Sequence, residues 1–338
     1  MNKCSIEHGL FNRRQFLKMS TLTGVGLIAN PSGVMPGASP KQKGISRIVI
    51  STDDAVRAGV NSFHERPVVR LLDRAIEEFF QVEHAVAAWK KLVTPSDVVG
   101  IKVNCLAGRG ISTNTVLVDA IIEKLLEAGV PNDRIIIWDR MNSDLEDAGF
   151  KISTVSRKPR CFGNDAAGYE PELTIHNSIG SLLSKALTQY CSVIINVPVL
   201  KDHGIVGFTG AMKNFFGAIH NPNKYHMNLG DPYIPDLCSL PVIREKTRLI
   251  IYDALNAQYE GGPPYMPQWR WNFNSIIVGT DPVAIDYTGW QLIETERKKK
   301  GLPPLKTAGR EPTYIATAAD AAHNLGTNNP DNIKVINV

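Results

Sequence analysis

The sequence predicts an α/β fold in which an open, mainly parallel sheet carries helices on both faces, Rossmann-like and with loop excursions. Short apolar runs of strand length alternate with segments of helical periodicity between residues 45 and 338. In the first half, a strand, a helix and a second strand follow one another with a short return, which favours parallel strands joined by a right-handed crossover. Two apolar runs end in polar, glycine-containing segments, which is typical of the ligand-binding edge of such a sheet.

The elements expected in the first half follow from apolar spacing and from helix-end residues. Val69, Leu72, Ile76 and Val86 recur near helical spacing and predict one long amphipathic helix. Gly129 marks the end of a second helix. In order, we expect a strand at residues 45–51, the long helix at 67–91, a strand at 97–104, a helix at 116–128 and a strand at 134–139.

The second half is less regular and contains the predicted excursions. Residues 156–172, with glycine, proline, asparagine and basic residues, are interpreted as one excursion, and the proline-rich residues 221–236 as a loop across the sheet edge. Asp281 followed by Pro282 predicts the start of a helix. The other expected elements are strands at 190–199, 248–254, 275–279 and 332–338, a turn-rich loop at 258–264, and helices at about 281–297 and 313–324.

Residues 1–40 are expected to be a twin-arginine signal peptide and linker. Arg13 and Arg14 stand before a weakly apolar stretch, residues 19–29, that is too short for a permanent membrane helix. Small residues at 37–39 offer a cleavage site. We therefore expect export by the twin-arginine pathway, a periplasmic or otherwise extracytoplasmic location, and no membrane span after signal removal.

The mature chain, residues 41–338, is expected to form a single α/β domain, with two lobes at about 41–150 and 151–338 as the alternative. The full chain has a net charge of +4, but four basic residues and one acid lie in residues 1–40. The mature part is therefore near neutral, and we expect no nucleic-acid partner.

The cysteine pattern limits the possible cofactors. Four of the five cysteines lie beyond residue 40, and none belongs to a C-x-x-C pair. We therefore expect no iron–sulfur cluster on this chain. An oxidising compartment would permit one or two disulfides, and Cys191, at the start of an apolar run, is interpreted as a packed thiol.

Residues 196–220 are the strongest indication of a functional site. This segment leaves an apolar strand and combines glycines with two lysines that lie close to histidine or aromatic residues. Glycine lets the backbone approach a ligand, and His and Lys side chains move protons, bind metals or attack carbonyls. A glycine-rich turn followed by a core helix is the alternative. Lys102 and Asn104 share one face of a neighbouring strand, which suits either a ligand or a strand end that meets water.

Three stretches of the chain resemble the domain of unknown function 362 family. They are residues 100–104 with the helix that follows, residues 196–204 running into 212–217, and Asp253 together with residues 260–263 and 281–284. The resemblance covers nearly all of residues 45–338. Many relatives carry a ferredoxin-like cysteine module that this chain lacks, so the resemblance implies no electron transfer through clusters of its own.

The order of a histidine, a glycine-rich turn and a lysine is also similar to the central motif of nickel-pincer lactate racemase and its relatives. That similarity implies that His203 is an acid/base, that Lys213 tethers a pyridinium-derived cofactor or acts electrostatically, and that His220 or His226 binds the metal. The racemases have a Gly-x-His where this chain has Asp139, so two-base racemisation is not expected. Asp139 is either a catalytic acid or a helix cap.

The predicted site has three groups of residues. They are catalytic His203 and Lys213, cofactor-binding Lys102, Asn104, Lys201 and Asn214, and metal-binding His226 and His220. The cofactor is not identified by the sequence, and a divalent metal or a metal-organic cofactor is the expectation. Apolar neighbours Phe215 and Phe216 should desolvate Lys213 and lower the pKa of its amine, whereas Lys201, beside Asp202, is expected in a wetter place.

Two functions remain open. The first is an exported enzyme, dependent on a cofactor or metal and of the oxidoreductase or isomerase class, that acts on a small anionic substrate. The alternative is a non-catalytic periplasmic binding or accessory protein for a small anion or a metal.

Overall fold

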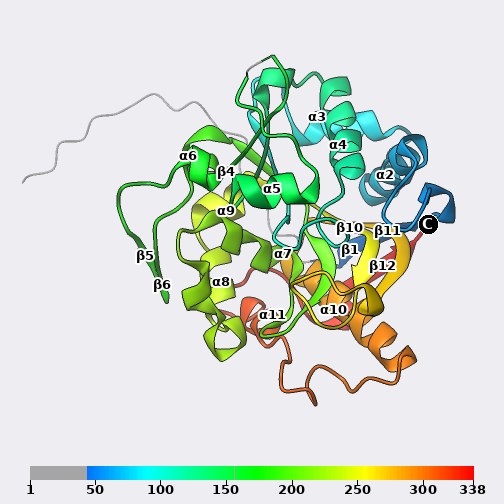
Figure 1. The fold of residues 1–338 in the computed structure, drawn as a ribbon, viewed down its shortest axis with the longest axis vertical. Helices are drawn as coiled ribbons and strands as arrows, with labels where there is room; N and C mark the ends of the chain where they lie inside the picture. Colours follow the sequence, from blue (N-terminus) through cyan, green and yellow to red (C-terminus); the bar gives the residue numbers. More distant parts are fainter. Residues whose placement is uncertain (1–43, 156) are drawn as a thin grey trace, which may run out of the picture. The chain divides into compact units, whose positions relative to one another are not determined.

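The structure is a computed structural model that describes residues 44–155 and 157–338 (Figure 1). The expected signal peptide and linker, residues 1–40, lie outside the described residues. The described residues belong to one compact unit built around a ten-stranded mixed sheet. Most neighbouring strands are parallel and helices pack against the sheet, so the predicted α/β class is confirmed.

The sheet has the strand order β12-β1-β11-β10-β7-β2-β3-β4, with β8 beside β10 and β9 beside β8. Its strands are β1 (Ser46–Thr52), β2 (Val99–Lys102), β3 (Ile135–Asp139), β4 (Arg160–Gly163), β7 (Val193–Asn196), β8 (Val199–His203), β9 (Gly207–Phe208), β10 (Thr247–Gln258), β11 (Arg270–Gly279) and β12 (Ile333–Asn337). From β10 to β4 all neighbours are parallel, as are β1 and β12. The strand β11 runs antiparallel to both β1 and β10. A separate hairpin is formed by β5 (Thr174–His176) and β6 (Ile179–Ser181).

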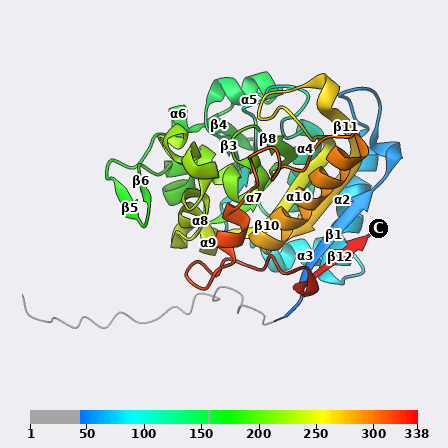
Figure 2. The same ribbon diagram turned by 90° about the horizontal axis from the view of Figure 1, so that it is seen from below.

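Successive strand residues point to opposite faces of the sheet and enter two separate cores. Val49 and Ile101 belong to the core that also contains α2 (Glu65–Phe80), α3 (Ala85–Leu92) and α4 (Thr115–Glu127). Ile48 and Ile136 belong to the other core, which contains α8 (Tyr233–Cys238), α9 (Pro241–Lys246), α10 (Pro282–Lys299) and α11 (Tyr314–Ala318). In Figure 1, α2 to α4 lie above the labelled strands β1, β10, β11 and β12, and α10 and α11 lie below them. Figure 2 shows the long α10, in orange, beside the same strands from underneath. Helices therefore cover both faces.

Three short helices follow strands that end near one another. They are α5 (Asn142–Ala148) after β3, α6 (Asn164–Ala167) after β4, and α7 (Gly210–Lys213) after β9. Two predicted helix ends are confirmed. Asp281 caps α10 by accepting the backbone N–H groups of Val283 and Ala284, and Gly129 follows α4 in the left-handed region with φ of 95°.

The single helix predicted for residues 67–91 is wrong, because α2 and α3 are separate. Gln81 adopts a left-handed conformation with φ of 53°, and its N–H bonds to the carbonyl oxygens of Glu77 and Glu78. This arrangement closes α2. Both helices pack on the same core, so the apolar spacing continues across a break that it does not reveal.

The excursion predicted for residues 156–172 is also partly wrong, since it contains β4 and α6. The strand β4 pairs in parallel with β3 and extends the sheet. Its apolar residues Cys161 and Phe162 are buried. Two such residues are too few to produce the alternation by which a strand is recognised in a sequence.

Several other boundaries differ from the predictions. The run at 190–199 divides into β7 and β8, so the lysine–histidine segment begins within a strand. The loop predicted at 221–236 contains 3₁₀ turns over Pro222–Gly230 and the start of α8, and the helix predicted at 313–324 is limited to α11. The strand β10 continues to Gln258, into the loop predicted at 258–264.

In the described part of the chain, no helix combines the length and apolar character that crossing a bilayer requires. Its cysteines are buried free thiols at Cys105, Cys161, Cys191 and Cys238. Burial raises the pKa of Cys191 to about 12, so the interpretation of this residue as a packed thiol is confirmed.

Candidate functional site

A pocket of about 330 Å³ opens where β2, β3 and β8 end. Its lining includes Asn104 beyond β2, Asp139 at the end of β3, His203 at the end of β8, Lys213 of α7, and His226 from the 3₁₀ turns. Carboxyl ends of parallel strands are where open α/β sheets bind ligands. The pocket therefore lies at the edge at which the sequence predicts a site.

Lys102 lies beneath the pocket and forms a buried ion pair. Its Nζ atom is 2.7 Å from Asp139 Oδ1, and neither side chain is appreciably exposed. The second carboxylate oxygen of Asp139 accepts the backbone N–H of Cys105 at 2.7 Å. Met141, not Asp139, is the N-cap residue of α5. The helix-cap interpretation of Asp139 is therefore wrong, and its carboxylate is the counter-ion of Lys102.

Three asparagines connect β2, β7 and α7 at the floor of the pocket. Asn214 Oδ1 accepts from Asn104 Nδ2 at 3.0 Å, and Asn214 Nδ2 donates to Asn196 Oδ1 at 2.8 Å. Lys102 Nζ also donates to Asn214 Oδ1, at 3.3 Å. Both ends of the Asn214 amide are therefore hydrogen-bonded to other side chains of the protein. By contrast, Asn104 Oδ1 is buried without a hydrogen-bond partner among the described residues, which leaves it to accept from a ligand.

The buried carboxylate of Asp286, on α10, fixes the start of α7. It accepts the N–H groups of Ala211 at 2.6 Å and Met212 at 3.1 Å, and the hydroxyl of Tyr252. Burial raises the pKa of Asp286 to about 7. A Cβ atom at Gly210 would lie 2.4 Å from Asp286 Oδ2, so this close approach requires glycine.

Lys213, at the end of α7, has an amine without a counter-ion. Its Nζ atom lies 4.9 Å from the centre of the Phe216 ring. Within residues 44–155 and 157–338, no acid pairs with it. Burial, and then the charge of Lys201, lowers the pKa of Lys213 to about 7. A large share of the amine is therefore neutral, and nucleophilic, at neutral pH.

His203 is held as a neutral hydrogen-bond donor. The backbone N–H groups of Ile205 and Val206 donate to its Nδ1 atom at 3.1 and 3.3 Å. Because Nδ1 accepts, the proton of the neutral ring is on Nε2. Burial, followed by the charge of Lys213, holds the pKa of His203 far below its usual range.

His226 is held in the opposite tautomer. Its Nδ1 atom lies 3.1 Å from the carbonyl oxygen of Pro222, which can only accept, so Nδ1 carries the proton and Nε2 a lone pair. Burial and Lys213 lower the pKa of His226 to about 4. The ring stacks on His203 with centroids 5.3 Å apart and an interplanar angle of 26°. Two adjacent pocket rings therefore carry one donor and one acceptor.

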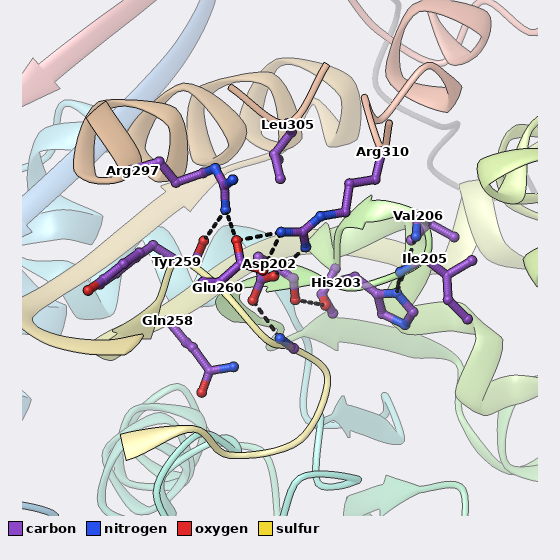
Figure 3. Close-up of polar contacts among 12 residues, drawn as sticks. Asp202, His203, Ile205, Val206, Gln258, Tyr259, Glu260, Arg297, Leu305 and Arg310 are labelled. Atoms are coloured by element: carbon purple, nitrogen blue, oxygen red, sulfur yellow. Dashed lines mark hydrogen bonds and ion pairs between the residues drawn. The ribbon is translucent and has the colours of Figure 1, made fainter. Parts of the chain in front are cut away.

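A network of ion pairs supports β8 next to His203 (Figure 3). Asp202 Oδ2 lies 2.8 Å from Arg310 Nη1. Arg310 also pairs with Glu260, which in turn pairs with the buried Arg297 of α10. The fully buried charge of Asp202 is therefore balanced by a chain of paired side chains.

The turn at residues 260–263 is bonded to β8 on both sides of His203. The N–H of Gly262 donates to Asp202 Oδ1 at 2.8 Å, and the N–H of Gly204 donates to the carbonyl oxygen of Gly262 at 2.7 Å. A Cβ atom at Gly262 would lie 2.2 Å from the backbone oxygen of Asp202. This glycine is thus required by the close contact that positions the histidine.

The prediction that Lys201 lies in a wetter place than Lys213 is wrong. Lys201 is 1% exposed and does not line the pocket. Its Nζ atom donates to the carbonyl oxygen of Ile111 at 3.2 Å, and burial lowers its pKa to about 8. All residues of β8 are buried, so the polar sequence around Lys201 does not indicate solvent.

His220 does not join His226. It is exposed, and its ring meets the edge of Tyr169 with centroids 5.3 Å apart. No group of three or more His, Cys, Asp or Glu side chains among the described residues is arranged to hold a metal ion. Of the two pocket histidines, His203 presents N–H at Nε2, and only His226 presents a free ring nitrogen. This donor set does not fit a metal held by protein ligands.

Arg140 and Asp144 also line the pocket and were not predicted. The guanidinium binds the carboxylate through Nε at 3.0 Å and Nη2 at 3.2 Å. Their spacing of four residues, directly after a strand, is a pattern that could have indicated them. No local pattern joins Arg310 to Asp202, 108 residues away.

The comparisons with known proteins give one family. The family described as Domain of unknown function (DUF362) matches residues 99–291, more than half of the chain. The matched region runs from β2 into α10 and contains the residues that line the pocket. A search of curated proteins found no match.

Proposed function

We propose that this chain, which belongs to the DUF362 family, is an enzyme that acts on a small anionic substrate in the pocket described above, with Lys213 as its working amine. The oxidoreductase or isomerase class remains the proposal, with an organic group or the substrate itself held at Lys213.

The observation that carries this proposal is the state of the Lys213 amine. Two other buried lysines of the described chain are paired with acids, Lys102 with Asp139 and Lys124 with Asp73. The buried Lys201 has no acid partner among the described residues either, but it donates to a backbone carbonyl and does not line the pocket. Lys213 faces a pocket instead, and its pKa is lowered to about 7. Maintaining a buried cation without a partner is costly, which is why perturbed lysines concentrate at functional sites.

Replacing Lys213 with methionine should abolish retention of a bound cofactor or ligand, with at least about a tenfold loss of occupancy. The reason is that the variant keeps the aliphatic stem but loses the amine. Whole-protein mass and absorbance of protein purified from its natural export route measure the retained group. Lys201→Met is the matched control, because it removes a second buried amine that does not line the pocket. Equal retention in both variants would contradict the proposal.

A non-catalytic binding protein is the second candidate, and the cations of the pocket favour it. Lys213 and Arg140 both line the pocket and would attract a small anion without any chemistry. This alternative predicts that wild-type protein is isolated unmodified and gains thermal stability with an anion such as phosphate. Thermal unfolding with and without phosphate, compared between wild type and Lys213→Met, measures that binding.

We also propose that the chain is exported by the twin-arginine pathway to the periplasm or another extracytoplasmic compartment. The support is the Arg13–Arg14 pair before a short apolar stretch. Replacing both arginines with lysine should leave the precursor in the cytoplasm, since the motif is read as an arginine pair. Cell fractionation with an immunoblot measures the outcome, and normal processing of the double variant would refute it.

A further inference from the structure

We propose that the pocket takes small 2-oxo acids and holds them as an imine on Lys213, with His203 donating to the carbonyl oxygen and His226 accepting the proton that is released. The proposal rests on the proposed function of Lys213 and adds to it the substrate class and a separate role for each histidine.

The amine meets the requirements of a carbonyl nucleophile. Lys213 lies within the pocket lining, is 9% exposed and has no acid partner in the described chain. Its lowered pKa, about 7, leaves the lone pair available at neutral pH. The nearby Phe216 ring supplies an apolar surface that contributes to desolvation of the amine and can stabilise the cationic iminium product.

The two histidines have fixed and different hydrogen-bonding roles. His203 receives two backbone N–H groups at Nδ1 and therefore presents an N–H at Nε2. His226 gives its Nδ1 proton to the Pro222 carbonyl and therefore presents a lone pair at Nε2. Protonation of His203 at Nδ1 would place an N–H opposite the two backbone N–H groups that now donate to this atom, which is unfavourable. His226 is therefore the base, and His203 is the electrophilic donor.

The step balances without an external oxidant or reductant. The amine lone pair attacks the carbonyl carbon, and the C=O π electrons move to oxygen, which takes a proton from solvent to become a hydroxyl. This solvent proton is the one proton that the overall reaction consumes. The nitrogen of this carbinolamine loses a proton to His226, and the same proton returns to the hydroxyl as it leaves as water. The products are a C=N⁺ iminium on Lys213 and one water molecule.

The carboxylate of such a substrate has a cation at the pocket wall. Arg140 lines the pocket and binds Asp144 through Nε and Nη2. Its Nη1 atom makes no hydrogen bond within residues 44–155 and 157–338, so a substrate carboxylate can bind there. The volume of about 330 Å³ is at the small end of ligand sites. A compact acid fits these features better than a phosphorylated sugar or a nucleotide.

The test is borohydride reduction of the full mature chain in the presence of pyruvate. Reduction adds hydride to the iminium carbon and fixes the adduct as a secondary amine. We expect a mass increase equal to pyruvic acid less one oxygen atom, mapped by peptide mass spectrometry to Lys213. Adduct formation should rise as pH increases through about 7, because the pKa of Lys213 lies there. Acetone, which lacks the carboxylate, should give much less adduct.

Matched variants separate the roles. Lys213→Met should give no adduct in the mapped peptide. Lys201→Met should still give the adduct at Lys213, but adduct formation should rise at a higher pH, because the charge of Lys201 no longer lowers the pKa of Lys213. Thermal unfolding checks that both variants are folded. His226→Phe and His203→Phe should each slow trapping by on the order of 10²-fold or more. Borohydride labelling spread over surface lysines, or no adduct at Lys213 above that with borohydride alone, would overturn the inference. If a different retained group is lost from Lys213→Met, the proposed function stands while the imine fails.

Discussion

Replacing Lys102 with methionine should lower the free energy of unfolding by about 3–5 kcal/mol, as expected when one member of a buried ion pair is removed. The substitution leaves the Asp139 carboxylate buried, with the Cys105 N–H as its remaining hydrogen-bond donor within the described residues. It also removes the ammonium donor to Asn214. Urea unfolding followed by circular dichroism measures the loss.

The control is the double variant Lys102→Met with Asp139→Asn. It removes both charges but keeps an amide oxygen for the Cys105 N–H, so it should recover most of the stability. If Lys102 served only to bind a cofactor, as the sequence predicted, the single variant would change the stability of cofactor-free protein by less than about 1 kcal/mol.

Replacing Gly207 with alanine should destabilise the protein by at least about 4 kcal/mol, the range of exceptional single substitutions. Gly207 has φ of 81°, and an added Cβ atom would lie 2.0 Å from the backbone oxygen of Arg310. Backbone cannot move aside as a flexible side chain can. Relief of the clash would displace the Arg310 segment, which supplies the partner of Asp202.

Gly309→Ala provides a control that separates strain from collision. Gly309 also has a positive φ, 73°, but nothing lies within 4 Å of its added Cβ atom. Gly309→Ala should lower the free energy of unfolding by only about 1–2 kcal/mol, the cost of a left-handed conformation for a residue with a side chain. The difference in unfolding free energy between the two variants therefore measures the steric term. Equal losses of unfolding free energy in the two variants would contradict this prediction, because they would show that the Arg310 segment moves away from the added Cβ atom at little cost.

The sequence predicted those parts of the fold whose pattern of apolar residues extends over a whole element. The central strands β2, β3 and β7 are buried throughout and apolar up to one polar residue at each carboxyl end, because helices cover both faces. Such runs are recognisable without knowledge of their neighbours. The strand β4 was missed because its position depends on pairing with β3, which four residues do not specify. Antiparallel β11 was recognised as a strand, but its direction is set by packing between β1 and β10.

The same distinction applies to the site. His203 and Lys213 were predicted because histidine and lysine among glycines are unusual in a turn, and His226 because the racemase-like motif has a later metal-binding histidine. All three line one pocket. The counter-ion of Lys102 could not be assigned, since Asp139 becomes its neighbour only through the register of β2 with β3. Lys201 was wrongly expected to be hydrated, because an adjacent aspartate suggests contact with water. Asp202 is instead neutralised by Arg310 from a distant segment.

The position of β1 has a consequence for the order in which the protein is assembled during synthesis. β1 lies between β11 and β12, with Val49 opposite Val278 and Ser46 opposite Ile333. A ribosome therefore exposes β1 long before either of its neighbours exists. Contacts of such wide sequence separation form slowly, because the loop between them must close first. The nascent chain thus carries an unpaired apolar strand until its last elements emerge, which makes it a natural client for chaperones that shield exposed strands.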